Sequence, residues 1–440
     1  MKLLTFRGGV HPPDNKHWTS DQPVEIVLPK GDLVYPMGQH IGAPCVPAVK
    51  KGDRVLVGQK IGEPQGPVSA AIYASVSGTV KNVTAMPTPS GIDMLSVIVE
   101  NDGLYEEIEP LNCRSFENLT ASELRDIIRD AGIVGMGGAC FPACIKLTPP
   151  AECVIDHVIV NAAECEPYLT SDYRLMLEEA EAIAEGAKIL LQIFPKAHLH
   201  IAIEDNKPLA IEKMKKAVQG IENVTVNVLK TKYPQGGEKQ LIFAVTGREV
   251  PSGKLPADAG CVVSNAYTVY EIRNAVVTGR TSLSRIVTVS GDAVATPKNM
   301  KVRLGTSFRE LIEAAGGFVT PPVKVLAGGP MMGMSVNSLD VPVIKGTSGI
   351  IALSDKAVHL YDEYPCIRCG RCVEACPMGL LPFKLNALSL KNDYMGFKEN
   401  GGMNCIECGS CSFMCPSKRH LVQSCREAKR SVIAAMKRKG

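Results

Sequence analysis

Two runs of four cysteines, each spaced C-x2-C-x2-C-x3-C and followed by proline, lie near the carboxyl end of the chain. Soft thiolates that converge on one small volume are the ligands that an iron–sulfur cluster needs. Zinc sites usually take their four ligands as two pairs, which leaves the third cysteine of each run and the duplication unexplained. The spacing therefore predicts iron–sulfur chemistry in preference to zinc binding or structural cysteines. The two runs are Cys366, Cys369, Cys372 and Cys376, and Cys405, Cys408, Cys411 and Cys415.

The spacing resembles that of bacterial two-cluster ferredoxins. In those proteins three thiolates of one run bind a 4Fe–4S cluster, and the fourth cysteine crosses to the other cluster. The resemblance implies two 4Fe–4S clusters in this chain. Glycines at 370 and 409 fall where the backbone must approach a cluster closely. The implied ligands are Cys366, Cys369, Cys372 and Cys415 for one cluster, and Cys405, Cys408, Cys411 and Cys376 for the other.

The composition is that of a globular protein. The chain has 440 residues, 45% of them hydrophobic and 21% charged, and its formal net charge of +3 gives no case for a nucleic-acid partner. The eight cysteines outside the two runs are scattered, which suits a reducing cytosol rather than a disulfide framework. No run approaches the roughly 18 apolar residues of a membrane span, and the amino terminus lacks the apolar core of a signal peptide. We therefore expect any membrane association to be peripheral.

Changes in the apolar pattern predict a multidomain protein with β and α/β parts. Short strands punctuated by Gly and Pro, such as Val24–Leu28, indicate an N-terminal β domain, and the stretch Val49–Gly62 resembles a lipoyl-like barrel-sandwich hybrid. Alternating strands and helices then predict a Rossmann-like α/β layer domain. The predicted ranges are 1–110 for the barrel-sandwich domain, 111–280 for the α/β flavin and NAD domain, 281–350 for a β-grasp domain of the soluble-ligand-binding (SLBB) type and 351–425 for the two-cluster ferredoxin domain. Residues 426–440 are predicted to form a basic tail, and the simplest interpretation of this tail is a solvated helix.

Within the α/β part, individual elements can be placed. A capped helix is predicted to begin at Thr120 and stop at Gly132. One long helix is predicted where apolar residues recur at three- and four-residue steps from Met176 to Phe194. Further strands are predicted over 157–160, 199–203 and 224–228, with a helix over 208–218.

A glycine-rich loop follows the first of these helices. Its glycines, Gly135, Gly137 and Gly138, would let backbone N–H groups approach a phosphate closely. An ordinary Rossmann fingerprint has a strand before it and Gly or Ala at its third position, but here a helix precedes the loop and Cys140 occupies that position. The residues thus disfavour an ordinary Rossmann site and leave a phosphate or flavin loop open.

Four segments resemble the flavin- and NADH-binding subunit of respiratory complex I, whose motifs are G-x-G-G-A-x-F-P-x-x-x-K, N-A-D-E-x-E-P, Y-x-x-G-E-E and N-N-x-x-T. The sequence departs from that family at Ala163 and Gly237, where the family has acidic residues. Together with an N-terminal Gly-Gly-Val-His-Pro-Pro and the two cysteine runs, the whole chain resembles the C subunits of Rnf complexes. The four segments are Gly135–Lys146, Asn161–Pro167, Tyr233–Lys239 and Ser264–Thr268.

The resemblance to complex I implies roles for individual residues. The three loop glycines would lie against FMN or nucleotide phosphate, with Lys146 near the flavin. Glu166 and Glu238 would contact the nicotinamide or ribose end of NAD, and Phe141 would stack on a ring. The residues implied to hydrogen-bond the flavin are Asn161, Glu164, Asn265 and Thr268.

The resemblance to Rnf C subunits implies electron exchange between NAD(H) and ferredoxin-derived electrons through FMN and two clusters. A flavin suits this place because it can take a hydride from NADH and pass electrons on singly. The hydride step needs no general acid or base, so no proton-transfer residue is assigned. The implied partners are the membrane subunits and the iron–sulfur B-type subunit, which would couple the transfer to Na+ or H+ movement and hold this chain peripherally on the cytoplasmic face of the cell membrane.

Two other functions are compatible with the same motifs. One is the related cobalamin reductase flavoprotein of propanediol microcompartments, which would reduce a corrinoid and need no membrane partner. The other is a non-catalytic adaptor that holds clusters but no flavin, as would follow if the departures at Ala163 and Gly237 had emptied the flavin site.

Overall fold

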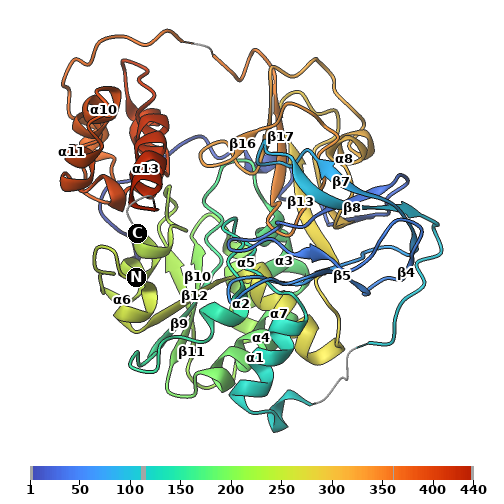
Figure 1. Cartoon of the computed structure of the whole chain (residues 1–440). Helices are drawn as coiled ribbons and strands as arrows, with labels where there is room; N and C mark the ends of the chain where they lie inside the picture. The colour runs from blue at the N-terminus through green and yellow to red at the C-terminus, as the bar shows by residue number, and fades with distance from the viewer. Residues whose placement is uncertain (1–2, 111–114, 360, 438–440) are drawn as a thin grey trace.

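The structure, a computed structural model, describes residues 3–110, 115–359 and 361–437. In these ranges the strands form four sheets, of six, four, four and three strands. Figure 1 shows the cysteine-bearing unit, with α10, α11 and α13, set to one side and joined to β17 by a long connection. The chain is thus built from separate α/β and β parts, as predicted.

The N-terminal β domain consists of two small antiparallel sheets that share one core. Side chains alternate between the two faces of a strand, so β8 turns Val97 and Val99 inward, where they are fully buried with Leu33 and Val55. The first sheet has the order β2 (Leu33–Pro36), β8 (Met94–Asn101), β7 (Gly78–Met86) and β4 (Arg54–Val55), and the second β3 (Val46–Pro47), β5 (Lys60–Glu63) and β6 (Ile72–Tyr73).

One predicted strand of this domain belongs to another sheet. Strand β1 (Glu25–Val27) forms within the predicted stretch Val24–Leu28, but it pairs in parallel with β14 (Lys298–Arg303) of the β-grasp sheet. Val27 packs against the β-grasp core, while Ile26 on the opposite face is exposed. The placement of this strand in the N-terminal domain was therefore wrong, because a short edge strand carries no sequence signal for which sheet it will join.

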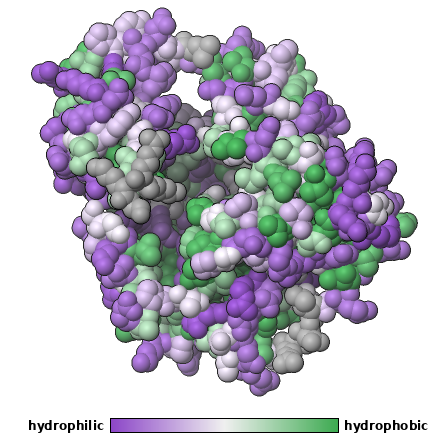
Figure 2. All heavy atoms as spheres, in the orientation of Figure 1, coloured by the Kyte–Doolittle hydropathy of each residue, from purple (hydrophilic) through white to green (hydrophobic). Residues whose placement is uncertain are grey.

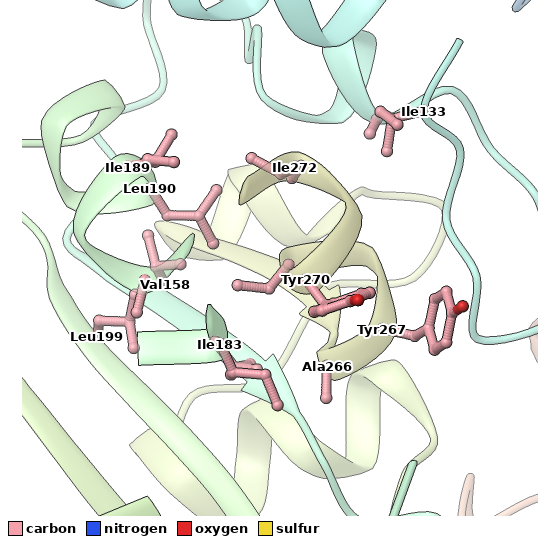
Figure 3. Packing of buried hydrophobic residues seen from close by; sticks show 14 of the residues in the cluster. Ile133, Val158, Ile183, Ile189, Leu190, Leu199, Ala266, Tyr267, Tyr270 and Ile272 are labelled. Atoms are coloured by element: carbon pink, nitrogen blue, oxygen red, sulfur yellow. The ribbon is translucent and has the colours of Figure 1, made fainter. Parts of the chain in front are cut away.

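The α/β domain is built on a fully parallel sheet with the order β11, β10, β9 and β12. Alternate residues of β9 face opposite layers: Val158 and Val160 pack against the large helical layer, and Ile159 packs on the side of α6. Figure 3 shows Ile183 and Leu190 of α4 packed between this sheet and α7. The bounds are β9 (His157–Asn161), β10 (His198–Glu204), β11 (Val224–Leu229), β12 (Cys261–Asn265), α1 (Ala121–Asp130), α2 (Ala143–Lys146), α3 (Ser171–Glu178), α4 (Ala180–Ile193), α5 (Pro208–Ala217), α6 (Glu238–Thr246) and α7 (Ala266–Thr278).

The helix predicted from Thr120 is confirmed, and its cap has a physical basis. Thr120 accepts a hydrogen bond from the backbone N–H of Glu123, and the Glu123 carboxylate accepts from the backbone N–H of Thr120. The single long helix predicted from Met176 to Phe194 was wrong, because the backbone breaks at Glu179 into α3 and α4. Both helices bury apolar residues in the same core, so the apolar period continues across the break and hides it.

The β-grasp domain is the six-stranded sheet, in the order β1, β14, β13, β17, β15 and β16, with α8 packed on it. Its loop Gly328–Gly333, between β15 and β16, reaches toward the α/β domain, as described below. The bounds are β13 (Ser284–Ser290), α8 (Phe308–Ala314), β15 (Lys324–Ala327), β16 (Met334–Ser335) and β17 (Gly349–Leu353).

The cysteine-bearing unit closes the chain with α9 (Arg371–Glu374), α10 (Pro382–Leu390), α11 (Tyr394–Glu399), α12 (Ser410–Met414) and α13 (Leu421–Lys437). The basic tail predicted to start at residue 426 is instead the continuation of α13, and residues 438–440 lie outside the described range. Cys425, Ala428 and Val432 of this helix pack against Leu385 and Phe397, so its first half belongs to the unit's own core.

Candidate functional site

The parallel sheet brings two predicted site residues together at its carboxyl edge. Asn161 ends β9, Asn265 ends β12, and the two are in register on neighbouring strands. Ligands of open α/β sheets bind outside the carboxyl ends of the strands. The candidate site is therefore placed by the sheet itself.

The glycine-rich loop closes on itself beside this edge. The N–H of Gly135 donates to the carbonyl of Phe141 at 2.8 Å, and the N–H of Cys140 donates to the carbonyl of Gly135 at 3.0 Å. A Cβ on Gly137 would lie 3.2 Å from the Cβ of Asn265, so a larger residue would require the loop or the start of α7 to move by a few tenths of an ångström. Gly138 is exposed and has φ +113°, a conformation that favours glycine.

The amino terminus of α7 faces the same loop. Asn265 caps the helix by accepting from the N–H of Tyr267 at 3.0 Å, and its Nδ2 donates to Asp172 at 2.6 Å. Thr268 Oγ1 accepts from the N–H of Met136 at 2.8 Å, which ties the helix to the loop. Backbone N–H groups and the helix dipole at this end favour a bound anion. The loop and the helix end together make a cradle suited to phosphate.

Lys146 and Glu238 form an ion pair beside the cradle. Lys146 Nζ lies 2.8 Å from Glu238 Oε1 and donates to the carbonyl of Val263, near the end of β12, at 3.0 Å. Both side chains are about one third exposed, and partly exposed ion pairs contribute little to stability. The pair can therefore exchange partners with a ligand at low energetic cost.

The segment after β9 is held from several sides. Asn161 donates to the carbonyl of Gly236 at 2.8 Å and accepts from the N–H of Ala163, while Glu164, at φ +48°, accepts from the N–H groups of Asp172 at 2.7 Å and Tyr173 at 3.2 Å. Burial raises the pKa of Glu164 to about 7. Its carboxylate thus satisfies the amino terminus of α3.

Glu166 lies under the β-grasp loop Gly328–Gly333. Its carboxylate accepts from the backbone N–H of Met331 at 3.0 Å and of Met332 at 2.9 Å, and burial raises its pKa to about 7 against the effect of these donors. A Cβ on Gly329 would lie 2.2 Å from the same carboxylate, so the close approach depends on that glycine. Glu166 therefore joins the flavin-type domain to the β-grasp domain.

Two buried lysines that the sequence did not single out support this segment. Lys16 donates to the carbonyls of Glu166 at 2.9 Å and Leu169 at 2.5 Å, and Lys207 donates to the carbonyl of Ala163 at 2.7 Å and pairs with Glu204 at 3.1 Å. Nothing in the local sequence marks either lysine, because each acts on a segment far along the chain.

The two departures from the complex I pattern have structural consequences. Ala163 is fully buried where the family has an acidic residue, and its carbonyl is engaged by Lys207. Gly237 precedes α6, and a Cβ there would lie 2.8 Å from the side-chain oxygen of Gln240. Neither position leaves space for the larger acidic residue without local rearrangement.

Several buried polar atoms around the cradle have no partner within the described part of the chain. They are Oδ1 of Asp172, both amide atoms of Gln235 and Nη1 of Arg285. Asp172 contacts Asn265, and Arg285 donates through Nη2 to the carbonyl of Met136 at 2.6 Å. Buried polar groups normally have partners, so their concentration here fits a site that is completed by a polar cofactor.

The structure brings together the cysteines that the ferredoxin resemblance assigns to one of the two clusters. Cys376, Cys405, Cys408 and Cys411 line one small cavity, and Cys425 lines it as well. Burial raises the pKa of Cys372, and the charges of Cys415 and Cys366 raise it further. The grouping of Cys366, Cys369, Cys372 and Cys415 stays a prediction. Among the described residues no three His, Cys, Asp or Glu side chains converge closely enough to hold a single metal ion. Cys366 and Cys369 are exposed.

The group with Cys376 lies against the α/β domain. Tyr233 Oη donates to the carbonyl of Cys408 at 2.7 Å, and the N–H of Gly9 donates to the carbonyl of Ala375 at 2.9 Å. Figure 2 shows a hollow on this face between the cysteine-bearing unit and the rest of the molecule. The group with the exposed Cys366 and Cys369 is the outer one.

Four family models match successive parts of the chain. They are the RnfC barrel sandwich hybrid domain over residues 4–104, the Nuo51 FMN-binding domain over 128–274, the SLBB domain over 286–335 and the 4Fe-4S dicluster domain over 365–421. These matches confirm the predicted fold class and the FMN and iron–sulfur cofactors. The predicted domain boundaries stay predictions.

Relatives share this arrangement from end to end. The C subunit of the proton-translocating ferredoxin:NAD(+) oxidoreductase complex of Clostridium ljungdahlii is 48% identical over 398 residues, which cover 90% of this chain and 87% of the relative. Its counterpart in the Na(+)-translocating ferredoxin:NAD(+) oxidoreductase complex of Acetobacterium woodii is 45% identical over 443 residues, with 100% and 99% covered. The chain belongs to the family of Rnf complex C subunits. Since its relatives are subunits of such complexes, the cobalamin reductase alternative is not favoured.

Membership in the Rnf C-subunit family agrees with the likeness to solved structures. A chain of the NAD+-reducing NiFe hydrogenase, in its air-oxidised state, aligns with a TM-score of 0.51 at 14% identity, covering 96% of this chain and 87% of that one. At this identity the likeness shows a common fold only. An Rnf C subunit therefore shares its domain arrangement with that hydrogenase chain.

One cavity of this Rnf C subunit lies away from the predicted site. It has a volume of about 440 Å³ and lies between β1, β14 and the carboxyl half of α7. None of the predicted flavin, NAD or cluster residues lines it. The candidate site thus rests on the carboxyl edge of the parallel sheet and on the two cysteine groups.

Proposed function

We propose that this chain exchanges electrons between NAD(H) and ferredoxin-derived electrons, as the NAD-side subunit of an Rnf complex. The observation that carries the proposal is the direct contact between the flavin-type domain and one cysteine group, through Tyr233 and Cys408. One NADH supplies two electrons as a hydride, and two clusters together accept two single electrons. FMN and the two clusters together would therefore supply each cofactor that such a transfer needs.

The residues proposed to hold FMN are those of the cradle. Gly135, Gly137 and Gly138 together with the start of α7 would receive the phosphate, because a glycine loop lets a phosphate approach the backbone and a helix amino terminus favours an anion. When bound, FMN supplies the exchange between a hydride donor and one-electron acceptors. The proposed hydrogen-bonding residues for its ring and ribityl chain are Asn161, Glu164, Asn265 and Thr268.

The NAD side is proposed to lie at the ion pair and the β-grasp loop. Lys146 would face the flavin, and Glu238, released from Lys146, would accept a hydrogen bond from a ribose hydroxyl or the nicotinamide amide. Glu166 is the second proposed contact, and it would have to exchange the N–H groups of Met331 and Met332 for the nucleotide. Phe141, half-buried at the end of the glycine loop, is the proposed stacking residue.

The contacts of the cysteine-bearing unit with the α/β domain support an order of the two clusters. The cluster proposed for Cys376, Cys405, Cys408 and Cys411 is the nearer to the flavin-type domain, and the cluster proposed for Cys366, Cys369, Cys372 and Cys415 is the outer. With exposed ligands, the outer cluster is the one an iron–sulfur partner could approach. Electrons would therefore pass between NAD(H) and the partner by way of the nearer cluster first.

The proposed location is peripheral, on the cytoplasmic face of the membrane. Among the described residues, no helix is both long and apolar enough to cross a bilayer. The names of the relatives describe subunits of ion-translocating complexes. The proposed partners are accordingly the membrane subunits and the iron–sulfur B-type subunit.

The proposal is tested on the isolated chain under anaerobic conditions. The protein is reconstituted with iron, sulfide and FMN, freed of unbound flavin and mixed with NADH, while flavin absorbance and cluster reduction are followed. Bleaching of retained flavin followed by cluster reduction supports the proposal. Intact clusters with no retained flavin and no response to NADH would favour the adaptor instead, and reduction of an added corrinoid would reopen the cobalamin reductase.

A further inference from the structure

The N-terminal segment Leu4–Val10 crosses from the α/β domain to the cysteine-bearing unit. Leu4 lies beside the end of β11, donating to the carbonyl of Val228 at 3.2 Å and accepting from the N–H of Lys230 at 2.9 Å. Further along, Lys232 donates to the carbonyl of Phe6 at 2.8 Å. The segment is thus fixed to the α/β domain before it reaches the cysteines.

Val10 and Tyr233 form the last contact on the α/β side. Each donates its backbone N–H to the other's carbonyl, at 2.8 and 2.9 Å, as in a short antiparallel pair. Tyr233 and Gly9, the residue before Val10, also donate hydrogen bonds to the cysteine-bearing unit. The N–H of Gly9 donates to Ala375, and Tyr233 Oη donates to Cys408.

These two bonds reach both cysteine runs. Ala375 precedes Cys376, the crossing ligand from the first run, and Cys408 is a ligand from the second run. We propose that Gly8, Gly9, Val10 and Tyr233 form a docking joint that positions the nearer cluster against the flavin site. This inference rests on the proposed function and assigns the N-terminal Gly-Gly-Val-His-Pro-Pro motif a part in it.

The joint requires its two glycines. Gly8 has φ +83°, and a Cβ there would lie 2.8 Å from the carbonyl oxygen of Cys376. Gly9 has φ +80°, and a Cβ there would lie 2.5 Å from the carbonyl oxygen of Tyr233. A larger residue at position 8 would push the segment away from Cys376, and one at position 9 would push it away from Tyr233.

The joint is also shielded from water. Val10, Tyr233, Ala375 and Cys408 are each less than a tenth exposed and form one apolar cluster, to which Met331 of the β-grasp loop adds. A hydrogen bond in such surroundings meets little competition from water. The Tyr233 hydroxyl donates to the carbonyl of Cys408 at 2.7 Å and lies farther, at 3.5 Å, from Oε1 of Glu166. It is therefore a positioning group that acts through the peptide of a cluster ligand, and its longer contact reaches a residue proposed for the nucleotide.

Two variants test the joint, each with a matched control. Tyr233→Phe removes the bond to Cys408 but keeps the ring, and its control is Tyr35→Phe, which removes a buried hydroxyl bonded to Ser75 in the N-terminal domain. Gly9→Ala introduces the clash, and its control is Gly52→Ala, where φ is +92° and no atom lies within 4 Å of the added Cβ. The controls thus carry the same loss of a hydroxyl or the same backbone strain away from the joint.

Each variant is measured in two ways. In the reconstituted protein, the rate of electron transfer to the clusters is followed after the flavin has been reduced by NADH or by light with a deazaflavin. Independently of any cofactor function, hydrogen–deuterium exchange is measured on peptides covering 4–10 and 405–411. Iron content confirms that both clusters are present.

The docking joint predicts slower cluster reduction in both variants, with flavin bleaching by NADH and iron content as in the controls. For Tyr233→Phe the expected decrease is about fivefold, the factor that corresponds to one typical buried hydrogen bond. Hydrogen–deuterium exchange in both peptides should rise.

The docking joint is overturned if exchange is unchanged and the clusters are reduced at the control rate. It is also overturned if flavin bleaching slows as much as cluster reduction, because that result would place Tyr233 at the nucleotide site. If NADH fails to bleach the flavin of the unaltered chain while exchange still rises, the proposed function fails and the joint stands.

Discussion

At the scale of single residues, the cysteines were predictable and their surroundings were not. The spacing predicted iron–sulfur chemistry, and the resemblance to two-cluster ferredoxins implied which thiolates share a cluster. Cys425 gave no such signal, yet it lines the cavity of the nearer group. Glu166 was predicted from a motif, but its engagement by Met331 and Met332 depends on a loop from another domain.

The ligand assignment predicts opposite results for two cysteines. Cys369→Ser should remove half of the bound iron and leave FMN binding unchanged, because Cys369 is an assigned ligand of the outer cluster. Cys425→Ser should keep all of the iron, although Cys425 contacts the nearer group. Iron and flavin are measured on the reconstituted proteins. Full iron in the Cys369 variant, or loss of iron in the Cys425 variant, would contradict the assignment.

Burial of Glu271 predicts a pH dependence of stability. Burial raises its pKa to about 7, opposed by Lys301. Between pH 4.5 and 7 the carboxyl group of Glu271 therefore keeps its proton in the folded protein and has lost it in the unfolded chain. The free energy of unfolding of the unaltered protein consequently decreases as the pH rises through this range. Glu271→Gln removes that loss, so the variant should match the unaltered protein near pH 5 and exceed it by on the order of 3 kcal/mol above pH 7. Thermal unfolding midpoints at pH 5 and pH 8 measure the difference, and equal differences at both values would speak against it.

At the scale of elements, periodicity predicted what local sequence controls. The helix at Thr120 carries its own cap and was predicted, and so were β9, β10 and β11 of the parallel sheet. The fourth strand, β12, was not predicted. The break at Glu179 and the transfer of β1 to the β-grasp sheet were missed, because each depends on partners distant in the sequence. The contact of the glycine loop with α7 likewise appears only when β9 and β12 are side by side.

That contact predicts the effect of one methyl group. Gly137→Ala would place a Cβ 3.2 Å from Asn265 and push the loop from α7, whereas Gly31→Ala places one 3.3 Å from the flexible carboxylate of Glu310, far from the site. Overpacking of this kind typically destabilises the packed conformation by about 1–3 kcal/mol. FMN affinity should therefore fall about tenfold or more in Gly137→Ala and stay unchanged in Gly31→Ala. Flavin titration of the apoproteins measures it. Equal affinities would show that the loop does not hold FMN.

At the scale of the whole molecule, the order of domains was predictable and their contacts were not. Each domain has a local signature, whereas the docking joint is made by groups that lie far apart in the sequence, such as Val10 with Tyr233 and Gly9 with Ala375. Those contacts decide which cluster is nearer to the flavin-type domain. The proposed order of electron transfer between the cofactors is therefore based on these contacts.

The most direct test compares two variants that each keep one cluster. Cys369→Ser should retain only the nearer cluster, and Cys411→Ser only the outer one. Each is mixed with NADH and frozen at increasing times for electron paramagnetic resonance. The account predicts that the nearer cluster in Cys369→Ser is reduced as fast as in the unaltered chain, while the outer cluster in Cys411→Ser stays oxidised on that timescale. Rapid reduction of the outer cluster in the absence of the nearer one would contradict it.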